Sequence, residues 1–202
     1  MLIQTTSDEE LMLSFQRGEV KSFEELYLRH KKPVYNYIVR YTNSPDESEE
    51  VFQEVFIKLH RAAPSYVPTA KFTTWLYTIV RNLCIDHHRK KIIRPTISMD
   101  ETYEDGSTSL RDRLASEDPA QDALNSDLEI SKILEEALTH INEDQREVFL
   151  LREKSGLKFE EIAETLNVSV NTVKSRMRYA LESLRKYLEK SGLKELNPKN
   201  NR

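Results

Sequence analysis

Hydrophobic residues recur every three or four positions along most of this chain, the spacing that gathers them on one face of an α-helix. A serine followed three residues later by a glutamate is a capping-box signature, and it occurs at Ser7 and again at Ser22, so both serines are predicted to cap a helix. Ser44, with a proline after it, is a third predicted cap. In the first 93 residues the pattern predicts helices from Ser7 to Gly18, from Ser22 to about Tyr41, from Ser44 onward and from about Thr73 onward.

A second group of helices is predicted nearer the C-terminus, where the pattern is that of a helix-turn-helix. A first helix is predicted from Phe159 to Leu166, and the next two residues interrupt it. Ser169 is a good N-cap, because its hydroxyl can accept a hydrogen bond from a free N–H of the following turn, so a second helix is predicted from Val170. The apolar face of that helix is predicted to be Val170, Val173, Met177, Ala180, Leu181, Leu184 and Leu188.

The opposite face of this second helix carries short polar and basic side chains that suit base edges and phosphates. Its members are Asn171, Thr172, Ser175, Arg176, Arg178 and Tyr179. Lys174 lies on the flank, where its ammonium is expected to reach a phosphate. From Lys174 to Lys186 five basic residues stand against one acidic residue, although the whole chain has a formal net charge of −4. An ordinary solvated helix is the alternative interpretation, but the short turn and the cap favour DNA binding.

The predicted third helix has a polar outer face that contains one apolar residue. Its core face is predicted to be Val51, Phe52, Val55, Phe56 and Leu59. Its outer face is predicted to be Glu50, Gln53, Glu54, Ile57, His60 and Arg61. A solvated surface is the plain interpretation of such a set. Ile57 fits that interpretation poorly, because an exposed isoleucine is better explained when something covers it, which hints at a protein partner.

A short proline-bearing loop and the predicted fourth helix offer a second surface for nucleic acid. Tyr66 is predicted to be an exposed aromatic in the loop, and Trp75 to fill the core. The helix residues predicted to point to solvent are Arg81, Asn82, Asp86, His88, Arg89, Lys90 and Lys91. A basic helix end beside an exposed ring can bind single-stranded nucleic acid, with cations along the phosphates and Tyr66 stacked on a base. His87 and His88 are adjacent and lie on different helix faces, which argues against a shared metal.

Composition narrows the class of protein further. Four glycines in 202 residues argue against an all-β fold and a Rossmann-type nucleotide site, and the single cysteine, Cys84, cannot form an internal disulfide. The chain has no apolar run of about 18 residues and no basic-then-apolar leader, so a cytoplasmic protein without membrane insertion is expected. Residues 94–129 hold three basic and ten acidic residues without hydrophobic periodicity, which predicts a flexible acidic linker.

Two stretches of the chain resemble one known family, the bacterial sigma-70-type initiation factors, and specifically their small extracytoplasmic-function (ECF) branch. The strings ESEEVFQEVFIKL and KFTTWLYTIVRNLCIDHHRKK, within residues 22–94, resemble the sigma-2 domain. The strings REVFLL, EIA and TVKSRMRYALESLR, within residues 133–188, resemble the sigma-4 domain. The resemblance implies an all-α protein with a sigma-2-like four-helix domain (1–93), an acidic linker (94–129), a sigma-4-like helix-turn-helix domain (130–190) and a tail (191–202).

The same resemblance implies a factor that directs core RNA polymerase to specific promoters and assists their opening, with no cofactor and no catalysis of its own. The clamp of the polymerase large subunit would bind Glu50, Gln53, Glu54 and Ile57. The opened minus-ten strand would contact the loop of residues 63–71 and the fourth helix through Tyr66, Lys71, Asn82, Asp86 and Arg89. Duplex minus-thirty-five DNA would be read by Ser169, Asn171, Thr172, Lys174, Ser175, Arg176 and Arg178. The sigma-4-like domain would also dock on the polymerase flap, and an anti-sigma factor as a further partner is left open.

Two other classes of protein compete with this interpretation. An autonomous transcription regulator can also end in a helix-turn-helix with EIA and TVK-like strings, but such response regulators carry an α/β receiver, and no alternating βα pattern precedes the unit here. A metal-dependent nuclease using Glu47, Glu49 and Glu50, or His87 and His88, lacks convergent ligands and a phosphate-binding loop. Promoter-specific transcription that needs both core polymerase and this protein would separate the three classes.

Overall fold

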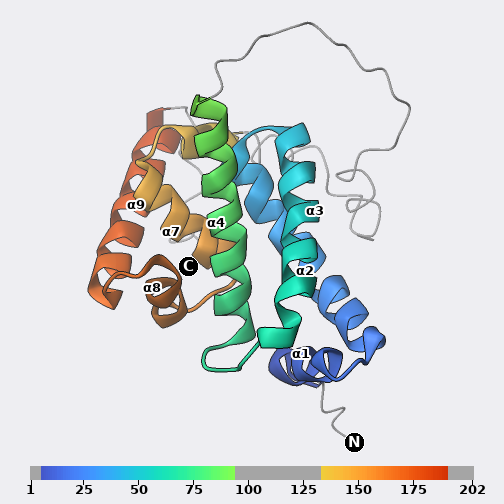
Figure 1. Cartoon of the computed structure of the whole chain (residues 1–202). Coiled ribbons are helices and arrows are strands. Elements are labelled where there is room, and N and C mark those ends of the chain that lie inside the picture. The colour runs from blue at the N-terminus through green and yellow to red at the C-terminus, as the bar shows by residue number, and fades with distance from the viewer. Residues whose placement is uncertain (1–5, 94–132, 191–202) are drawn as a thin grey trace, which may run out of the picture. The chain divides into compact units, whose positions relative to one another are not determined.

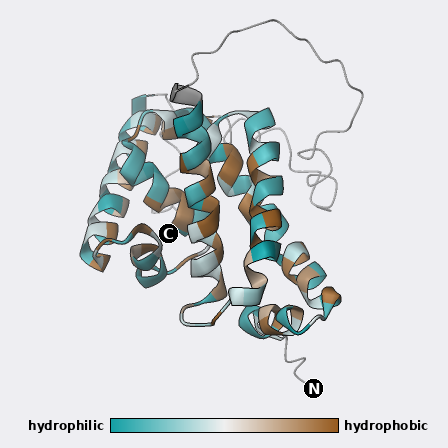
Figure 2. Cartoon of the chain, in the orientation of Figure 1, coloured by the Kyte–Doolittle hydropathy of each residue, from teal (hydrophilic) through white to brown (hydrophobic). Residues whose placement is uncertain are grey.

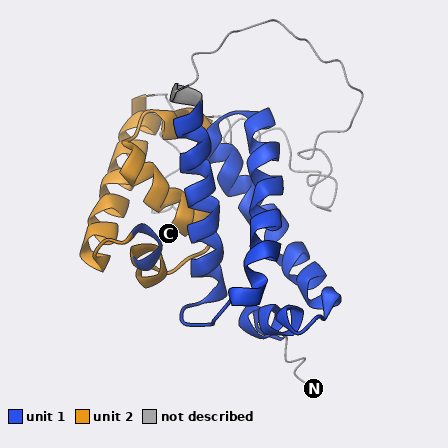
Figure 3. Ribbon diagram, viewed as in Figure 1, with its two compact units in different colours: residues 1–117, 164–166 blue, residues 118–163, 167–202 orange. Residues whose placement is uncertain are grey.

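Helices are the only regular elements in the residues that the structure describes (Figure 1). The computed structural model describes residues 6–93 and 133–190. One compact unit contains α1 (Asp8–Gln16), α2 (Val20–Thr42), α3 (Pro45–Ala62), a 3-10 turn η1 (Ala63–Ser65) and α4 (Phe72–Ile93). The other contains α7 (Glu143–Glu153), most of α8 (Phe159–Leu166) and α9 (Val170–Lys190) (Figure 3). The predicted all-α fold class is confirmed, and the predicted acidic linker lies outside the described residues.

Of the two capping boxes predicted for the first two helices, the one before α1 is present and the one predicted for α2 is not. The Ser7 hydroxyl accepts a hydrogen bond from the N–H of Glu10 at 3.2 Å, and the Glu10 carboxylate accepts one from the N–H of Ser7 at 3.0 Å, so the predicted capping box is confirmed. Gly18 has a φ of +100°, a conformation that favours glycine, and it turns the chain directly into α2. Because this turn is so short, α2 begins at Val20, and Ser22 is buried inside the helix instead of capping it.

The turn from α2 into α3 uses a backbone contact where a side-chain cap was predicted. Asn43 ends α2 with a φ of 52°, in the left-handed region. Ser44 occupies the N-cap position of α3 and Pro45 follows it, but the Ser44 side chain makes no capping hydrogen bond. The Ser44 carbonyl instead accepts hydrogen bonds from both the N–H and the hydroxyl of the buried Ser48. Ser44 therefore marks the start of α3 without stabilising it through its own hydroxyl.

Aromatic rings form much of the core of the first unit. Every residue predicted for the inner face of α3 is buried, and Figure 2 shows hydrophobic and hydrophilic residues alternating along the helices accordingly. The ring centroids of Phe52 and Phe56 lie 5.0 Å apart, and Tyr27 and Tyr35 of α2 pack on them edge to face. Rings favour this geometry and bury large apolar areas when they adopt it. The rotation of α3 about its axis is thereby fixed, which determines the face it presents to solvent.

The second unit contains the helix-turn-helix formed by α8 and α9, and α7 packs against α9. Its core is formed by Val148, Leu150, Leu151, Leu157, Ile162, Val173 and Ala180. α8 spans the predicted residues, and Asn167, with a φ of 53°, makes the turn toward α9. The prediction that Leu181 belongs to the buried face of α9 was wrong, because its side chain is 49% exposed. One residue turns a helix by about 100°, so the position after the buried Ala180 falls outside a narrow contact face.

Candidate nucleic-acid and protein interfaces

The first turn of α9 is held by its own side chains. The Ser169 hydroxyl accepts a hydrogen bond from the N–H of Thr172 at 3.1 Å and lies 2.9 Å from the Thr172 hydroxyl. The Ser175 hydroxyl donates to the carbonyl oxygens of Asn171 and Thr172, both at 3.0 Å. The predicted cap at Ser169 is confirmed. These bonds fix the start of α9, which is the part of a recognition helix that meets base edges.

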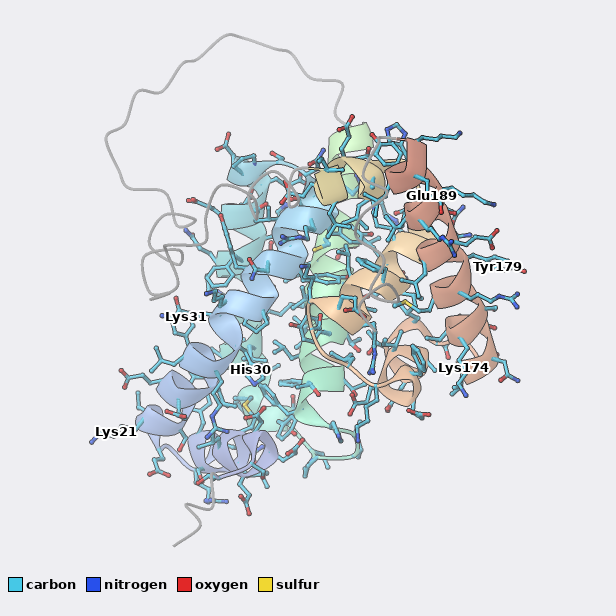
Figure 4. The ribbon with its side chains drawn as sticks, turned by 180° about the vertical axis from the view of Figure 1, so that it is seen from behind. Lys21, His30, Lys31, Lys174, Tyr179 and Glu189 are labelled. Carbon is cyan, nitrogen blue, oxygen red and sulfur yellow. The ribbon has the colours of Figure 1, made fainter. Side chains whose placement is uncertain are left out.

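The residues predicted to contact duplex DNA form one surface on α9 but differ in exposure. Four of them are exposed, namely Ser169, Asn171, Lys174 and Arg178, and three are half-buried, namely Thr172, Ser175 and Arg176. Lys174 and Tyr179 lie on the outer side of α9 (Figure 4). The Arg178 guanidinium lies 4.9 Å from the ring centroid of Tyr179, which is itself 46% exposed. The surface thus combines an amide, an ammonium, a guanidinium and an aromatic ring within reach of solvent.

Arg176 is paired with a residue that the sequence did not suggest. Its Nη2 donates to Oδ2 of Asp144, which lies in the first turn of α7. The Arg176 side chain is 25% exposed to solvent, whereas that of Asp144 is 57% exposed. The pair therefore holds the Arg176 guanidinium in one direction, toward the start of α7.

The outward face of α3 has the predicted residues and one neighbour that sequence reasoning missed. Glu50 and Gln53 are exposed, Glu54 is half-buried, and Ile57 is 50% exposed. Beside them lies the buried His87 of α4, whose Nε2 is 2.8 Å from Oε2 of Glu54 and whose Nδ1 is 4.0 Å from Oε2 of Glu50. The imidazole holds the Glu54 carboxylate in place. No local sequence pattern predicts this contact, because 33 residues separate His87 from Glu54.

Tyr66 is buried, so the prediction of an exposed, base-stacking ring was wrong. Its side chain is 5% exposed, and its ring centroid lies 4.8 Å from that of Trp75 and 6.3 Å from that of Phe72. Its hydroxyl has no hydrogen-bond partner in the described part of the chain. Burial raises the pKa of Tyr66 to about 12, with a smaller contribution from the negative charges of Glu9 and Asp8. The Tyr66 ring packs on Phe72 and Trp75 at the start of α4, and this packing could not be predicted from the sequence of the loop alone.

The remaining residues predicted to contact the opened strand are exposed but do not form a single cluster. Lys71 stands just before α4, whereas Asn82, Asp86 and Arg89 are exposed farther along it. Steps of four and three residues place the latter three on one helix face. With a rise of 1.5 Å per residue, Lys71 and Arg89 lie about 27 Å apart along the axis. The structure therefore brings Asn82, Asp86 and Arg89 together and leaves Lys71 with the loop of residues 63–71.

Residues 6–93 and 133–190 contain neither a metal-binding cluster nor a membrane-spanning helix. No three histidine, cysteine, aspartate or glutamate side chains converge there in a way that would hold a metal ion. The two adjacent histidines diverge, since His87 faces Glu54 and His88 is exposed. No helix in these ranges combines the length and the apolar character of a membrane span.

Comparison with known proteins matches both helical regions to one family. The family model described as Sigma-70 region 2 matches residues 26–92, and the one described as Sigma-70, region 4 matches residues 131–184. The RNA polymerase sigma-H factor of Pseudomonas aeruginosa is 32% identical over 193 residues, which cover 93% of this chain and 97% of that protein. The ECF RNA polymerase sigma factor SigW of Bacillus subtilis is 31% identical over 173 residues, which cover 86% of this chain and 92% of that protein. The chain belongs to the ECF branch of the sigma-70 family.

Two solved structures have the same fold as this sigma factor. The structure of CnrH in complex with the cytosolic domain of CnrY has a TM-score of 0.65 and 21% identity, and the match covers 91% of this chain and 98% of that one. The sigma factor RpoE of Bartonella quintana, in complex with the anti-sigma factor NepR, has a TM-score of 0.61 and 21% identity, with 84% and 98% covered. Sigma factors of this family bind core RNA polymerase and promoter DNA, so the interpretation made from the sequence motifs is confirmed at the level of the family.

Proposed function

We propose that this sigma factor acts in the cytoplasm by binding alone, directing core RNA polymerase to specific promoters without performing chemistry itself. The observation that carries the proposal is the exposed face of α9 that follows the Ser169 cap, where Asn171, Lys174 and Arg178 lie on one surface. An asparagine amide matches the donor and acceptor pair of adenine in the major groove, and a guanidinium matches the two acceptors of guanine. Lys174 then serves as a phosphate contact that sets the register.

The outward face of α3 is the proposed docking surface for the polymerase clamp. Its negative charge comes from Glu50 and Glu54, and His87 keeps the second of these carboxylates oriented at 2.8 Å. Ile57 adds an apolar group that is 50% exposed in the free protein. Acidic groups around an apolar anchor fit a basic partner surface, because the charges speed the encounter while the apolar contact is fully desolvated on binding.

The opened minus-ten strand is proposed to bind along α4 and at the loop of residues 63–71. Asn82, Asp86 and Arg89 supply one polar face for this strand, and Lys71 supplies a cation about 27 Å away along the helix axis. Tyr66 has no place in direct contact, because its ring is packed on Trp75. Preference for the unpaired strand over the duplex is what favours melting in this scheme.

The two units are proposed to act as a pair. With a net charge of −4, the free factor attracts phosphate only through local basic patches, so it should bind promoter DNA weakly by itself. On core polymerase, two contacts carried by one chain reinforce each other through effective concentration. An anti-sigma partner is part of the same proposal, since one of the two solved neighbours was captured with a protein named as an anti-sigma factor.

The proposal is tested by transcription from candidate promoters with purified components. Promoter-specific run-off product is expected only when core polymerase and this protein are both present. Sequence-specific binding by the protein alone, with tightness unaffected by polymerase, would instead support an autonomous regulator. Turnover of nucleic acid by the protein alone would support an enzyme and refute the proposal.

The docking surface is tested separately with Glu54→Ala. Loss of this carboxylate removes both the charge and the partner of His87, so co-purification with core polymerase should weaken. Lys58→Ala is a suitable control, because Lys58 is exposed on the same helix and lies outside the proposed set. Unchanged co-purification of the Glu54 variant would remove this face from the proposal.

A further inference from the structure

The proposed function leaves α1 without a role, yet α1 touches the loop of residues 63–71 through a side chain of its own. Nε2 of Gln16 lies 3.0 Å from the carbonyl oxygens of Ala63 and Pro64 and 3.2 Å from that of Tyr66, and its two N–H groups donate to all three, with one N–H shared between two acceptors. A 3-10 turn leaves most of its carbonyls without a partner inside the turn. Gln16, 47 residues or more away in sequence, reaches two of the three carbonyls of η1 and that of Tyr66 after it, and the Ala63 carbonyl also accepts from the N–H of Tyr66.

A second residue of α1 holds the opposite end of the same loop. Oε1 of Glu9 accepts a hydrogen bond of 2.7 Å from the backbone N–H of Phe72, the first residue of α4. The first N–H groups of a helix have no partner within it, and a negative charge at this end is favoured by the helix dipole. Glu9 therefore acts as a helix cap supplied from 63 residues away. Figure 1 shows α1 lying beside η1 at the end of the unit where the loop begins.

The helix that makes these two contacts is itself anchored. Asp8 accepts hydrogen bonds from Arg29 of α2 and contacts His30, both at 2.8 Å. Leu11 and Met12, on the inner side of α1, are 8% and 0% exposed. Between the two held ends, the middle of the loop turns outward, with Val67 64% exposed. The loop is thus fixed at both ends by one rigid element while its tip remains accessible.

We propose that α1 positions the loop of residues 63–71 for capture of the opened promoter strand, with Gln16 and Glu9 as the positioning residues. The inference rests on the proposed function, because it assumes that this loop meets single-stranded DNA. Fixing a loop in its binding conformation lowers the entropy that binding must otherwise overcome. Neither residue needs to touch DNA, since both act through the backbone of the loop.

The test uses the complex of the full chain with core polymerase and a promoter that the run-off assay has found active. Affinity is measured for a fluorescent single strand covering the minus-ten region and, separately, for a duplex covering the minus-thirty-five region. Gln16→Ala removes three hydrogen bonds, and it is expected to weaken single-strand binding about tenfold, equivalent to about 1.4 kcal/mol. Duplex binding and polymerase association should be unchanged. Arg17→Ala is the matched control, because Arg17 is the exposed neighbour and, among the described residues, its side chain bonds to Ser14 within α1 and not to the loop.

Glu9 allows a second, independent test, in which one substitution removes the cap and a conservative one keeps it. Glu9→Ala removes the cap from Phe72 and should also weaken single-strand binding, whereas Glu9→Gln keeps an acceptor oxygen and should restore most of it. Fluorescence of the sole tryptophan, Trp75, checks that each variant keeps the first unit folded at the assay temperature.

The results distinguish failure of the positioning role from failure of the proposed function on which it rests. Wild-type single-strand affinity in both alanine variants would overturn the positioning role. Equal losses on the single strand and on the duplex would also overturn it, since α1 would then only support the fold. Failure of the wild-type protein to direct transcription at all would instead refute the proposed function, before any variant is compared.

Discussion

The two candidate DNA-contacting regions of this sigma factor are built in opposite ways. The surface of α9 is organised by bonds between residues three or four positions apart, such as those from Ser169 to Thr172 and from Ser175 to Asn171. The loop of residues 63–71 is organised by Gln16 and Glu9, which lie 47 to 63 residues away. A helix face carries its own geometry wherever the helix forms. A loop has the geometry that its neighbours impose, so it is sensitive to changes far from it in sequence.

The largest expected difference between the two regions concerns their tyrosines. Tyr66→Ala should destabilise the first unit by about 3–5 kcal/mol, as for other buried aromatic truncations, because the ring packs on Trp75 and Phe72. Tyr179→Ala should cost less than about 1 kcal/mol, because that ring is half exposed and lies against the guanidinium of Arg178. Urea unfolding measures both, with Trp75 fluorescence reporting the first unit and circular dichroism the whole chain.

A third variant refines the same comparison. Tyr66→Phe removes a hydroxyl that has no partner among the described residues, so stability should be unchanged or slightly higher. A clear loss of stability in this variant would mean that the hydroxyl is hydrogen-bonded in solution.

The next effect concerns recognition by α9. Arg176→Ala is expected to weaken use of the upstream element by about 1–3 kcal/mol at matched sites, as for other base-contacting arginines. The change in affinity is measured by competition binding to the polymerase complex, with matched and scrambled duplexes as competitors. Equal weakening on both duplexes would assign Arg176 to the phosphate backbone. Asp144→Ala removes only the partner of Arg176 and should change affinity by less than about 1 kcal/mol, because the ion pair is partly exposed.

A smaller effect compares two serines at helix starts. Ser169→Ala should cost about 1 kcal/mol of stability in the second unit, because the hydroxyl caps α9 by bonding to the N–H of Thr172. Ser44→Ala should cost much less, because that side chain makes no capping hydrogen bond in α3. Thermal unfolding of the two variants side by side tests the pair, and equal losses would contradict the distinction.

The smallest effect concerns the pH dependence of the contact that anchors α1. Burial raises the pKa of Asp8, but hydrogen bonds and charge from His30 and Arg29 outweigh it and leave the pKa below its ordinary value. A carboxyl whose pKa is lower in the folded state stabilises the fold above its unfolded pKa, near 3.9, and this stabilisation is lost as the pH falls through the folded pKa. Asp8→Asn should therefore be less stable than wild type at neutral pH, and the gap should narrow below about pH 4. A constant gap down to pH 2 in urea titrations would assign the effect to packing.

Much of the helical architecture was predictable because its signals are local. Hydrophobic spacing placed the inner face of α3, the capping box at Ser7 was recognised from a glutamate three positions on, and the cap at Ser169 from a serine directly before an apolar helical pattern. The errors at Ser22 and Leu181 are local as well. In the first, a short turn at Gly18 started α2 before the serine, and in the second, the contact face of α9 proved narrower than its apolar stripe.

The sequence by itself determined which segments are helical, where α9 begins and, through its motifs, which family the chain belongs to. Only the tertiary structure decided that Tyr66 is buried, that His87 orients Glu54, that Asp144 aims Arg176, and that Gln16 and Glu9 hold the loop between η1 and α4. The physical reason is the distance along the sequence between the residues that interact. Helix periodicity and capping depend on neighbours within one or two turns of the same helix. Tyr66 instead packs on residues across the end of a loop, and the other four contacts join residues 32 to 63 positions apart, where only packing determines which side chains meet.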